Sequence, residues 1–184
     1  LHYKPYFKEK GIRIIEIPYF FAGSSDILYS HGKQNLWIGY DQRTSLKAAY
    51  YISELLQSNN LNITCLKLVN PKFYHLNLCF CPFGDRYALV YKDAFDIESF
   101  RLIKSIFGEN FIIQLSNQEA NNLIGNSLFI NDISRKSNGY LIGNKFSNRL
   151  KTKISYLNII CIDLPLSEFI VGGGSVKSLV LDIS

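Results

Sequence analysis

Short apolar runs recur along the whole chain and are separated by polar turns and amphipathic segments. The apolar runs predict β-strands, because strands are short and rich in branched and aromatic residues. The predicted strands are residues 12–17, 27–29, 36–38, 63–68, 76–80, 88–91, 111–115, 127–131, 158–163 and 176–181. Pro18 ends the first of them, and the Gly84-Asp85 pair predicts a turn between the sixth strand and the run before it.

Four segments have helical spacing. Residues 44–57 place apolar side chains on one face, and Thr44 fits the N-cap position. Residues 96–107 predict a second helix, capped by Asp96. Shorter helices are expected at residues 119–122 and 144–151. The order strand, strand, helix, strand then repeats about three times, which predicts a modular α/β fold for a single domain, residues 1–184.

The composition supports a folded domain. Apolar residues make up 47% of the 184 residues and charged residues 19%, which excludes the disordered class. No apolar run approaches the roughly 18 residues that cross a bilayer, so we expect no membrane partner.

The formal charge of +5 permits an anionic partner without arguing for one. The basic residues gather in two places, Arg135-Lys136 and a later run, and aromatic residues lie among them. The later run comprises Lys145, Arg149, Lys151 and Lys153. No nucleic-acid-binding motif accompanies these residues, so a solvated helix face is the simpler interpretation and nucleic acid is not expected as a partner.

Cysteine and histidine residues give no metal-binding pattern. The four cysteines, Cys65, Cys79, Cys81 and Cys161, lie in apolar runs without CxxC spacing. Two of the three histidines, His2 and His31, show no readable pattern. We therefore expect buried, reduced thiols, a cytoplasmic location, no metal and no cofactor.

Three motifs suggest a candidate site. The C-terminal part contains Gly172-Gly173-Gly174-Ser175-Val176-Lys177-Ser178, a glycine triplet before an apolar run. Residues 73–82 read Phe-Tyr-His-Leu-Asn-Leu-Cys-Phe-Cys-Pro, with His75 at the start of an apolar run. Residues 20–26 read Phe-Phe-Ala-Gly-Ser-Ser-Asp. The last two motifs also fit plain structural roles, a histidine at a strand start and an ordinary turn.

Together these motifs resemble the guanidine-modifying, or pentein, superfamily, and most closely its dimethylarginine dimethylaminohydrolase and amidinotransferase branch. The resemblance implies an α/β propeller of five ββαβ modules. By that count about one and a half modules are missing before Leu1, so we expect a partial pentein domain that lacks its N-terminal module. The chain contains no Met, which also suggests that it begins inside a longer product.

The resemblance also implies roles for individual residues. In this superfamily a cysteine thiolate attacks the guanidinium carbon, and a histidine protonates the leaving amine and activates water. His75 and Ser178 occupy these two catalytic positions, so Ser178 replaces the nucleophile. Asp26, Asn77, Gly173 and Gly174 are the expected substrate-binding residues. Carboxylates match a guanidinium well, so Asn77 in place of an acid and Ala22 in place of a glutamate each remove a partner for it.

Three hypotheses follow. The leading one is a degenerate member that keeps a guanidinium-type pocket without efficient turnover. The second is an active guanidine or amidine hydrolase in which the cysteine has been changed to serine. The third is a non-catalytic pentein that binds or assembles. Ser178 as an independent nucleophile is disfavoured, because no Gly-x-Ser-x-Gly elbow surrounds it and no acid nearby in the sequence orients His75.

The expected partners are an arginine-like or guanidino small molecule and either a second polypeptide or a second copy that completes the ring. In that arrangement His75 and Ser178 converge on one central cavity, with Asp26 on the same rim.

Overall fold

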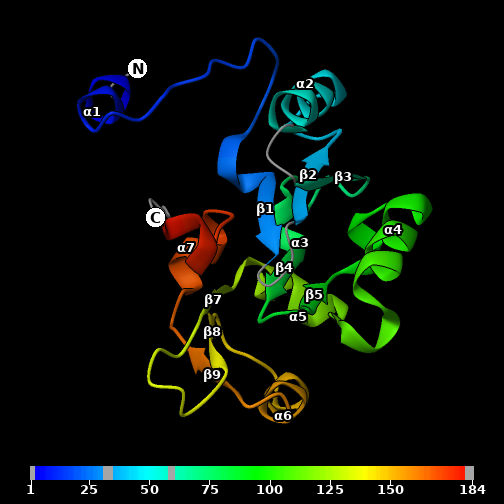
Figure 1. The fold of residues 1–184 in the computed structure, drawn as a ribbon. Coiled ribbons are helices and arrows are strands. Elements are labelled where there is room, and N and C mark those ends of the chain that lie inside the picture. Colours follow the sequence, from blue (N-terminus) through cyan, green and yellow to red (C-terminus); the bar gives the residue numbers. More distant parts are fainter. Residues whose placement is uncertain (1–2, 31–34, 58–60, 181–184) are drawn as a thin grey trace.

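Three small sheets carry the fold of this computed structural model, which describes residues 3–30, 35–57 and 61–180 (Figure 1). Each sheet has three strands. The first strand pairs antiparallel with the second, and the second pairs parallel with the third. A parallel pair needs a crossover connection, and a helix supplies it in each sheet. The predicted threefold repeat of strand, strand, helix, strand is therefore confirmed within an α/β fold.

The three units follow one another along the chain. The first is β1 (Ile27–Ser30), β2 (Asn35–Tyr40), α2 (Leu46–Leu56) and β3 (Asn62–Lys67). The second is β4 (Phe80–Phe83), β5 (Tyr87–Val90), α4 (Ile97–Phe107) and β6 (Ile112–Gln114). The third is β7 (Leu128–Ile130), β8 (Gly139–Gly143), α6 (Asn148–Ser155) and β9 (Ile159–Asp163).

Further short elements connect or flank these units. The α-helices are α1 (Tyr3–Glu9), α3 (Leu76–Cys79), α5 (Asn117–Asn121) and α7 (Ser167–Val171). The 3-10 helices are η1 (Gly23–Ser25), η3 (Lys92–Ala94), η4 (Glu109–Phe111), η5 (Ile124–Asn126) and η6 (Val176–Leu179). The first strands of successive units lie side by side, with β4 in contact with both β1 and β7.

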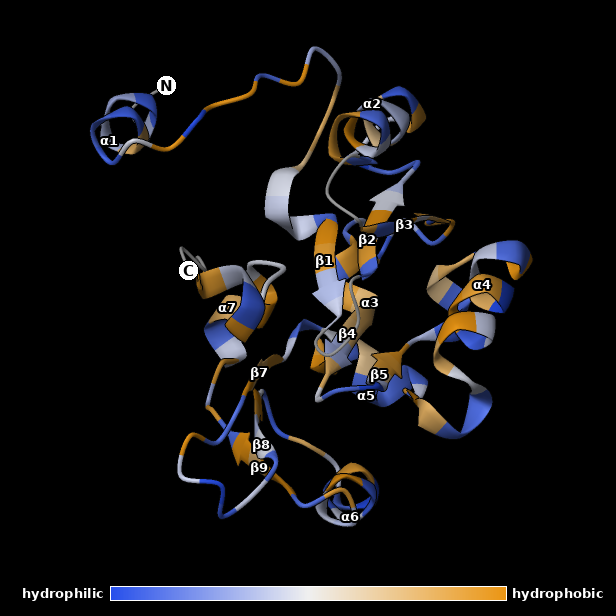
Figure 2. Cartoon of the chain, viewed as in Figure 1, coloured by the Kyte–Doolittle hydropathy of each residue, from blue (hydrophilic) through white to orange (hydrophobic). Residues whose placement is uncertain are grey.

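An aromatic cluster joins the first two units. The Trp37 ring of β2 lies 5.2 Å from the Phe80 ring of β4 and 5.3 Å from the Phe107 ring of α4, measured between centroids. All three side chains are buried. Figure 2 shows hydrophobic residues concentrated on the central strands β1, β2 and β5. This shared core fixes the relative position of the first two sheets.

Polar side chains define where the helices begin. The Asp96 side chain accepts a hydrogen bond from the Ser99 N–H and caps α4, as predicted. Helix α2 is capped by Ser45, so the prediction of Thr44 as its cap was wrong. The Thr44 hydroxyl instead donates to Asp26. Helix α6 begins after Ser147, four residues later than the predicted start.

Two predicted strands are helical turns. The predicted strand 76–80 contains one turn of helix, α3, and only Phe80 belongs to a strand. All four side chains of α3 are buried, and an apolar run of this length does not distinguish a strand from a buried helix. The predicted strand 176–181 begins with the 3-10 turn η6, while its last residue, Leu181, lies outside the described residues.

The secondary structure also differs from the prediction towards both ends of the chain and in the third unit. Residues 12–17 form no strand, whereas the preceding Tyr3–Glu9 segment is helical. Strand β8 was not predicted, because glycines at both of its ends resemble turn signals. Helix α7 was also missed. His2 and His31 lie outside the described residues.

Candidate functional site

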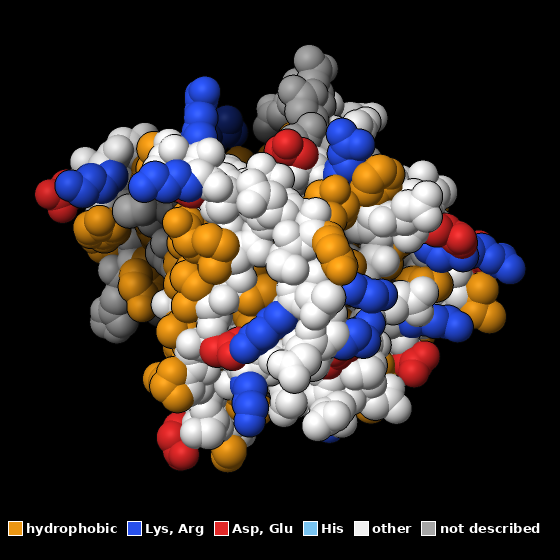
Figure 3. Space-filling model, turned by 90° about the horizontal axis from the view of Figure 1, so that it is seen from below, with side chains coloured by type: hydrophobic (Ala, Val, Ile, Leu, Met, Phe, Trp, Pro, Cys, Tyr) orange, Lys and Arg blue, Asp and Glu red, His pale blue; other side chains and the backbone are white. Residues whose placement is uncertain are grey.

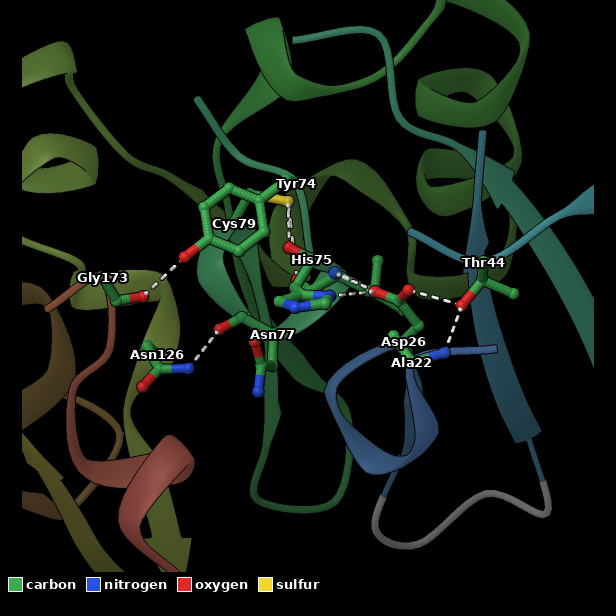
Figure 4. A network of polar contacts seen from close by, with 10 residues as sticks. Ala22, Asp26, Thr44, Tyr74, His75, Asn77, Cys79, Asn126 and Gly173 are labelled. Carbon is green, nitrogen blue, oxygen red and sulfur yellow. Dashed lines mark hydrogen bonds and ion pairs between the residues drawn. The ribbon is translucent and has the colours of Figure 1, made fainter. Parts of the chain in front are cut away.

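A fully buried carboxylate, Asp26, lies at the centre of the candidate site (Figure 4). It follows the 3-10 turn η1 and leads into β1. Its Oδ2 accepts a hydrogen bond of 2.6 Å from the Thr44 hydroxyl, and its Oδ1 accepts one of 2.9 Å from the Leu76 N–H. These donors satisfy a charge that burial alone would make very unfavourable.

The same carboxylate orients His75. The His75 Nδ1 lies 3.3 Å from Asp26 Oδ1, and the imidazole side chain is 22% exposed. His75 has extended backbone geometry at the N-cap of α3, which places its ring beside Asp26 while the next N–H reaches the same oxygen. The sequence does not reveal Asp26 as the acid beside His75, because 49 positions separate the two residues. An acid that holds an imidazole in place is a recurring feature of acid–base catalysis.

A buried amide, Asn126, organises the turn that contains Ser178. Its Oδ1 accepts hydrogen bonds from the Ser175 N–H at 2.8 Å, the Ser178 N–H at 3.2 Å and the Ser178 hydroxyl at 3.1 Å. Its Nδ2 donates to the Asn77 carbonyl at 3.0 Å. The sequence gives no signal for the role of Asn126, since nothing local marks contacts over 49 and 52 positions.

Gly173 and Gly174 allow the chain to approach this site closely. Gly173 has a φ of +87°, and a Cβ there would lie 2.5 Å from the Tyr74 hydroxyl. A Cβ on Gly174 would lie 2.9 Å from the Ser178 Cβ. The Gly173 carbonyl accepts a 3.4 Å hydrogen bond from Tyr74, whose ring also contacts the His75 ring. The described contacts of both glycines are within the chain, and their role as ligand contacts stays a prediction.

Two bridges therefore bring the sites of His75 and Ser178 into one region. Tyr74 connects His75 to the glycine triplet, and the Asn77–Asn126 hydrogen bond connects α3 to the Ser178 turn. Ser178 is exposed. Its hydrogen bonds within the described part of the chain go to Asn126 and Ser175, and none goes to His75.

A cavity of about 430 Å³ opens between the first strands of the three units. Its lining is largely apolar and includes Phe21, Phe80, Phe129, Leu28 and Leu128. Asn77 and Lys177 line it as well. Asn77 is buried, and its side-chain oxygen has no hydrogen-bond partner in the described part of the chain. The volume is in the range of small-molecule sites.

Burial disfavours the thiolate forms of the cysteines near the cavity. Burial raises the pKa of Cys81, which lines the cavity, to about 12 against the opposing effect of Lys177. Burial also raises the pKa of Cys79 well above its ordinary value. All four cysteines are free. Among residues 3–30, 35–57 and 61–180, no group of three or more His, Cys, Asp or Glu side chains could hold a metal ion.

No helix in the described ranges has both the length and the hydropathy needed to cross a membrane.

Comparisons with known proteins identify the family of this chain. A family model for N,N dimethylarginine dimethylhydrolase, eukaryotic, matches residues 13–184. The bifunctional arginine dihydrolase/ornithine cyclodeaminase ArgZ of Synechocystis is 32% identical over 185 residues, covering all of this chain and 25% of ArgZ. The dimethylarginine dimethylaminohydrolase of Mycobacterium tuberculosis is 24% identical, covering 98% of this chain and 55% of that protein.

Two solved structures have a fold similar to that of this chain. The N-terminal domain of ArgZ, crystallised as a cysteine-to-serine mutant bound to substrate, superposes with a TM-score of 0.90 at 32% identity. The match covers all of this chain and 65% of that one. A dimethylarginine dimethylaminohydrolase structure superposes with a TM-score of 0.70 at 19% identity, covering 94% of this chain and 64% of that one, which shows the fold alone. The chain thus spans about a quarter of the length of ArgZ.

Proposed function

Because this chain belongs to the dimethylarginine dimethylaminohydrolase family, we propose that it binds an arginine-type small molecule in the central cavity and does not hydrolyse it efficiently. By arginine-type we mean a small molecule whose chain ends in a guanidino group. The observation that carries the loss of turnover is the environment of Ser178. Its hydroxyl is hydrogen-bonded to the amide oxygen of Asn126, and an amide oxygen is not a base that could activate it.

The site residues have distinct roles in this proposal. His75, held by Asp26, is a remnant acid–base group that lies beside the cavity lining without being part of it. Ser178 occupies the nucleophile position in a degenerate form. Asn77 contacts the ligand from the cavity wall, and Gly173 and Gly174 allow the backbone to approach it. Asp26 contributes by positioning His75, since its buried oxygens already accept hydrogen bonds from within the chain.

One observation favours the alternative of an active hydrolase with serine in place of cysteine. The Asp26–His75 contact is intact, although a domain without turnover has no need of it. Under this alternative a single change, Ser178→Cys, restores the reaction. Under the degenerate reading it does not, because Ala22 and Asn77 still offer no carboxylate to orient a guanidinium.

Formation of a ureido product tests the two readings, with citrulline expected from arginine or dimethylarginine and the carbamoyl diamine from agmatine. We expect the native chain to give no product above a His75→Ala variant, and Ser178→Cys to recover little. The matched control is Ser175→Cys, which introduces the same thiol three residues away at a buried position. Turnover by the native chain would contradict the proposal. Strong recovery by Ser178→Cys alone would establish the second reading.

The arrangement of the three units supports a proposal about partners. We propose that they form part of a five-module α/β propeller, completed by a second polypeptide or by a second copy of this chain. Several exposed apolar side chains lie before β1, on β1 and near the C-terminal part: Phe20, Tyr29, Phe169 and Val171. Figure 3 shows hydrophobic side chains gathered on one part of a face. A cytoplasmic location is part of the proposal and rests on the four free cysteines.

A further inference from the structure

The N-terminal arm, which we define as residues 3–17, extends away from the three units (Figure 1). Its helix α1 buries none of its side chains, whereas α2, α4 and α6 each bury at least two. The arm is nevertheless rich in apolar side chains, and Tyr3, Tyr6, Ile12 and Ile15 are between 40% and 74% exposed. Exposed apolar surface that is gathered in one place is typical of an interaction site.

The arm has the same order of elements as the second half of each unit. In the units a helix leads through a turn into the third strand, α2 into β3, α4 into β6 and α6 into β9. In the arm, α1 leads through a turn into the apolar residues 12–17. The second unit is a close match: Gly11 after α1 and Gly108 after α4 have φ values of +72° and +83°, and Ile-Ile-Glu-Ile at 14–17 corresponds to Ile-Ile-Gln-Leu at 112–115. The arm therefore corresponds to half of a further unit.

The strand-like run of this half-unit has no neighbouring strand in the described part of the chain. Third strands lie at the edge of all three sheets, and each pairs parallel with the middle strand of its unit. The Leu115 N–H, for example, donates to the Val90 carbonyl at 2.9 Å. Residues 13–17 make no such bond to any backbone group that the structure describes. An open row of N–H and C=O groups is a template for pairing with a further strand.

The row of first strands is open at the same end of the chain. The first strands pack in the order β1, β4, β7, so β1 ends the row next to the arm in the sequence. Ile17 and Phe21 pack against the core of the first unit, which anchors the arm beside it. Tyr29 on β1 lines the cavity and is 59% exposed. By the order of the units, the first strand of the unit to which the arm belongs would lie beside β1.

We infer that the arm is the docking site for a β-hairpin of another polypeptide, whose second strand pairs parallel with residues 12–17 and whose first strand lies beside β1. The inference rests on the part of the proposed function in which another chain completes the ring, and it names the contact. Four of residues 12–17 are isoleucine, so the partner strand is rich in branched and aromatic residues. A second copy does not fit, because its middle strands β2, β5 and β8 already have a neighbour on each side.

The hairpin of β4 and β5 supplies a probe, because β5 is the parallel neighbour of the strand that residues 14–17 resemble. A cyclised peptide of residues 80–90 with the substitution Cys81→Ser is added to the full chain at about 1 mM, since an isolated hairpin is only marginally stable. Hydrogen–deuterium exchange then reports on the backbone of the arm. We expect the peptide to slow the exchange of residues 13–17 by at least about tenfold, and a cyclic peptide of scrambled sequence to have no effect.

Ile15→Pro is the variant that tests the pairing itself. Ile17 corresponds to Leu115, so the N–H groups of Ile17 and Ile15 face the added strand, and proline removes the second of them. This variant should abolish the protection of the remaining arm amides. The matched control is Ile97→Pro, which should retain it, because Ile97 is exposed at the first position of α4, where proline is tolerated.

Failure of the peptide to protect the arm, or protection that Ile15→Pro leaves intact, would overturn the inference. The proposed partner would still stand if the native chain sediments as an associated species. A native chain that is not protected by the peptide and sediments as a monomer would overturn both the inference and the proposed partner. Arm amides whose protection increases with protein concentration in the absence of peptide would show that a second copy occupies the arm, which also overturns the inference.

Discussion

At the residue scale, Asn126 is the group on which the Ser178 turn depends. One buried carboxamide accepts from two backbone N–H groups and a hydroxyl and donates to a carbonyl of α3. Removing it leaves the Ser175 N–H and the Asn77 carbonyl buried without these partners. A buried polar group without a partner costs about 1–3 kcal/mol.

We therefore predict that Asn126→Ala lowers the free energy of unfolding by about 2–4 kcal/mol. Asn138→Ala is the control, because Asn138 is exposed and its side chain makes a single hydrogen bond, to Leu157. Its loss should cost about 0.5–1 kcal/mol. Urea denaturation of the three proteins measures the difference, and equal losses in the two variants would show that the Asn126 contacts add little.

At the element scale, Glu119 couples the second and third units. It belongs to the capping box of α5 and accepts hydrogen bonds from Arg149 and Ser147 at the start of α6. Burial raises the pKa of Glu119, but the hydrogen bonds from Arg149, Ser147 and Ser116 outweigh it and hold the pKa at about 2. Because the folded-state pKa lies below the ordinary value of 4.5, the contribution to stability is complete above about pH 4.5.

This contribution should disappear as the pH falls from about 4.5 towards 2. We predict that Glu119→Gln lowers the free energy of unfolding at pH 7 by roughly 1–3 kcal/mol and flattens its dependence on pH over that window. Glu98→Gln, which removes an exposed pair with Arg101, should leave stability nearly unchanged. Denaturation curves between pH 2 and 7 provide the measurement. A Glu119→Gln curve parallel to that of the native chain would contradict the assignment.

The helices and strands differ in how well the sequence predicts them. Strands β2, β3, β5, β6 and β9 and helix α4 follow local pattern and capping, so periodicity finds them. The turns α3 and η6 do not, because their conformation depends on distant partners. The Leu76 N–H bonds to Asp26 across 50 positions, and Ser178 bonds to Asn126 across 52. The motifs predict His75 and Ser178 as site residues, whereas their hydrogen-bond partners become visible only in the folded chain.

At the scale of the whole molecule, exposed apolar side chains bear on how the chain behaves in solution. The first strands of the units pack in the order β1, β4, β7, and the cavity lies between them. Several apolar side chains elsewhere on the chain are exposed, with Phe20 at 86% and Val171 at 88% exposure. Where such side chains gather, they are typical of interaction sites.

We predict that the isolated chain associates, either with itself or with a polypeptide that completes the ring. Sedimentation velocity over a range of concentrations should show species heavier than the 21.1 kDa monomer. Replacing Phe20 and Val171 with Asp should shift the distribution towards monomer, because charges would have to be buried in the contact. The paired change Tyr156→Asp and Ile133→Asp is the control, since both residues are equally exposed but belong to the third unit. A native chain that sediments as a monomer at all concentrations and unfolds cooperatively would show that three units form a complete fold.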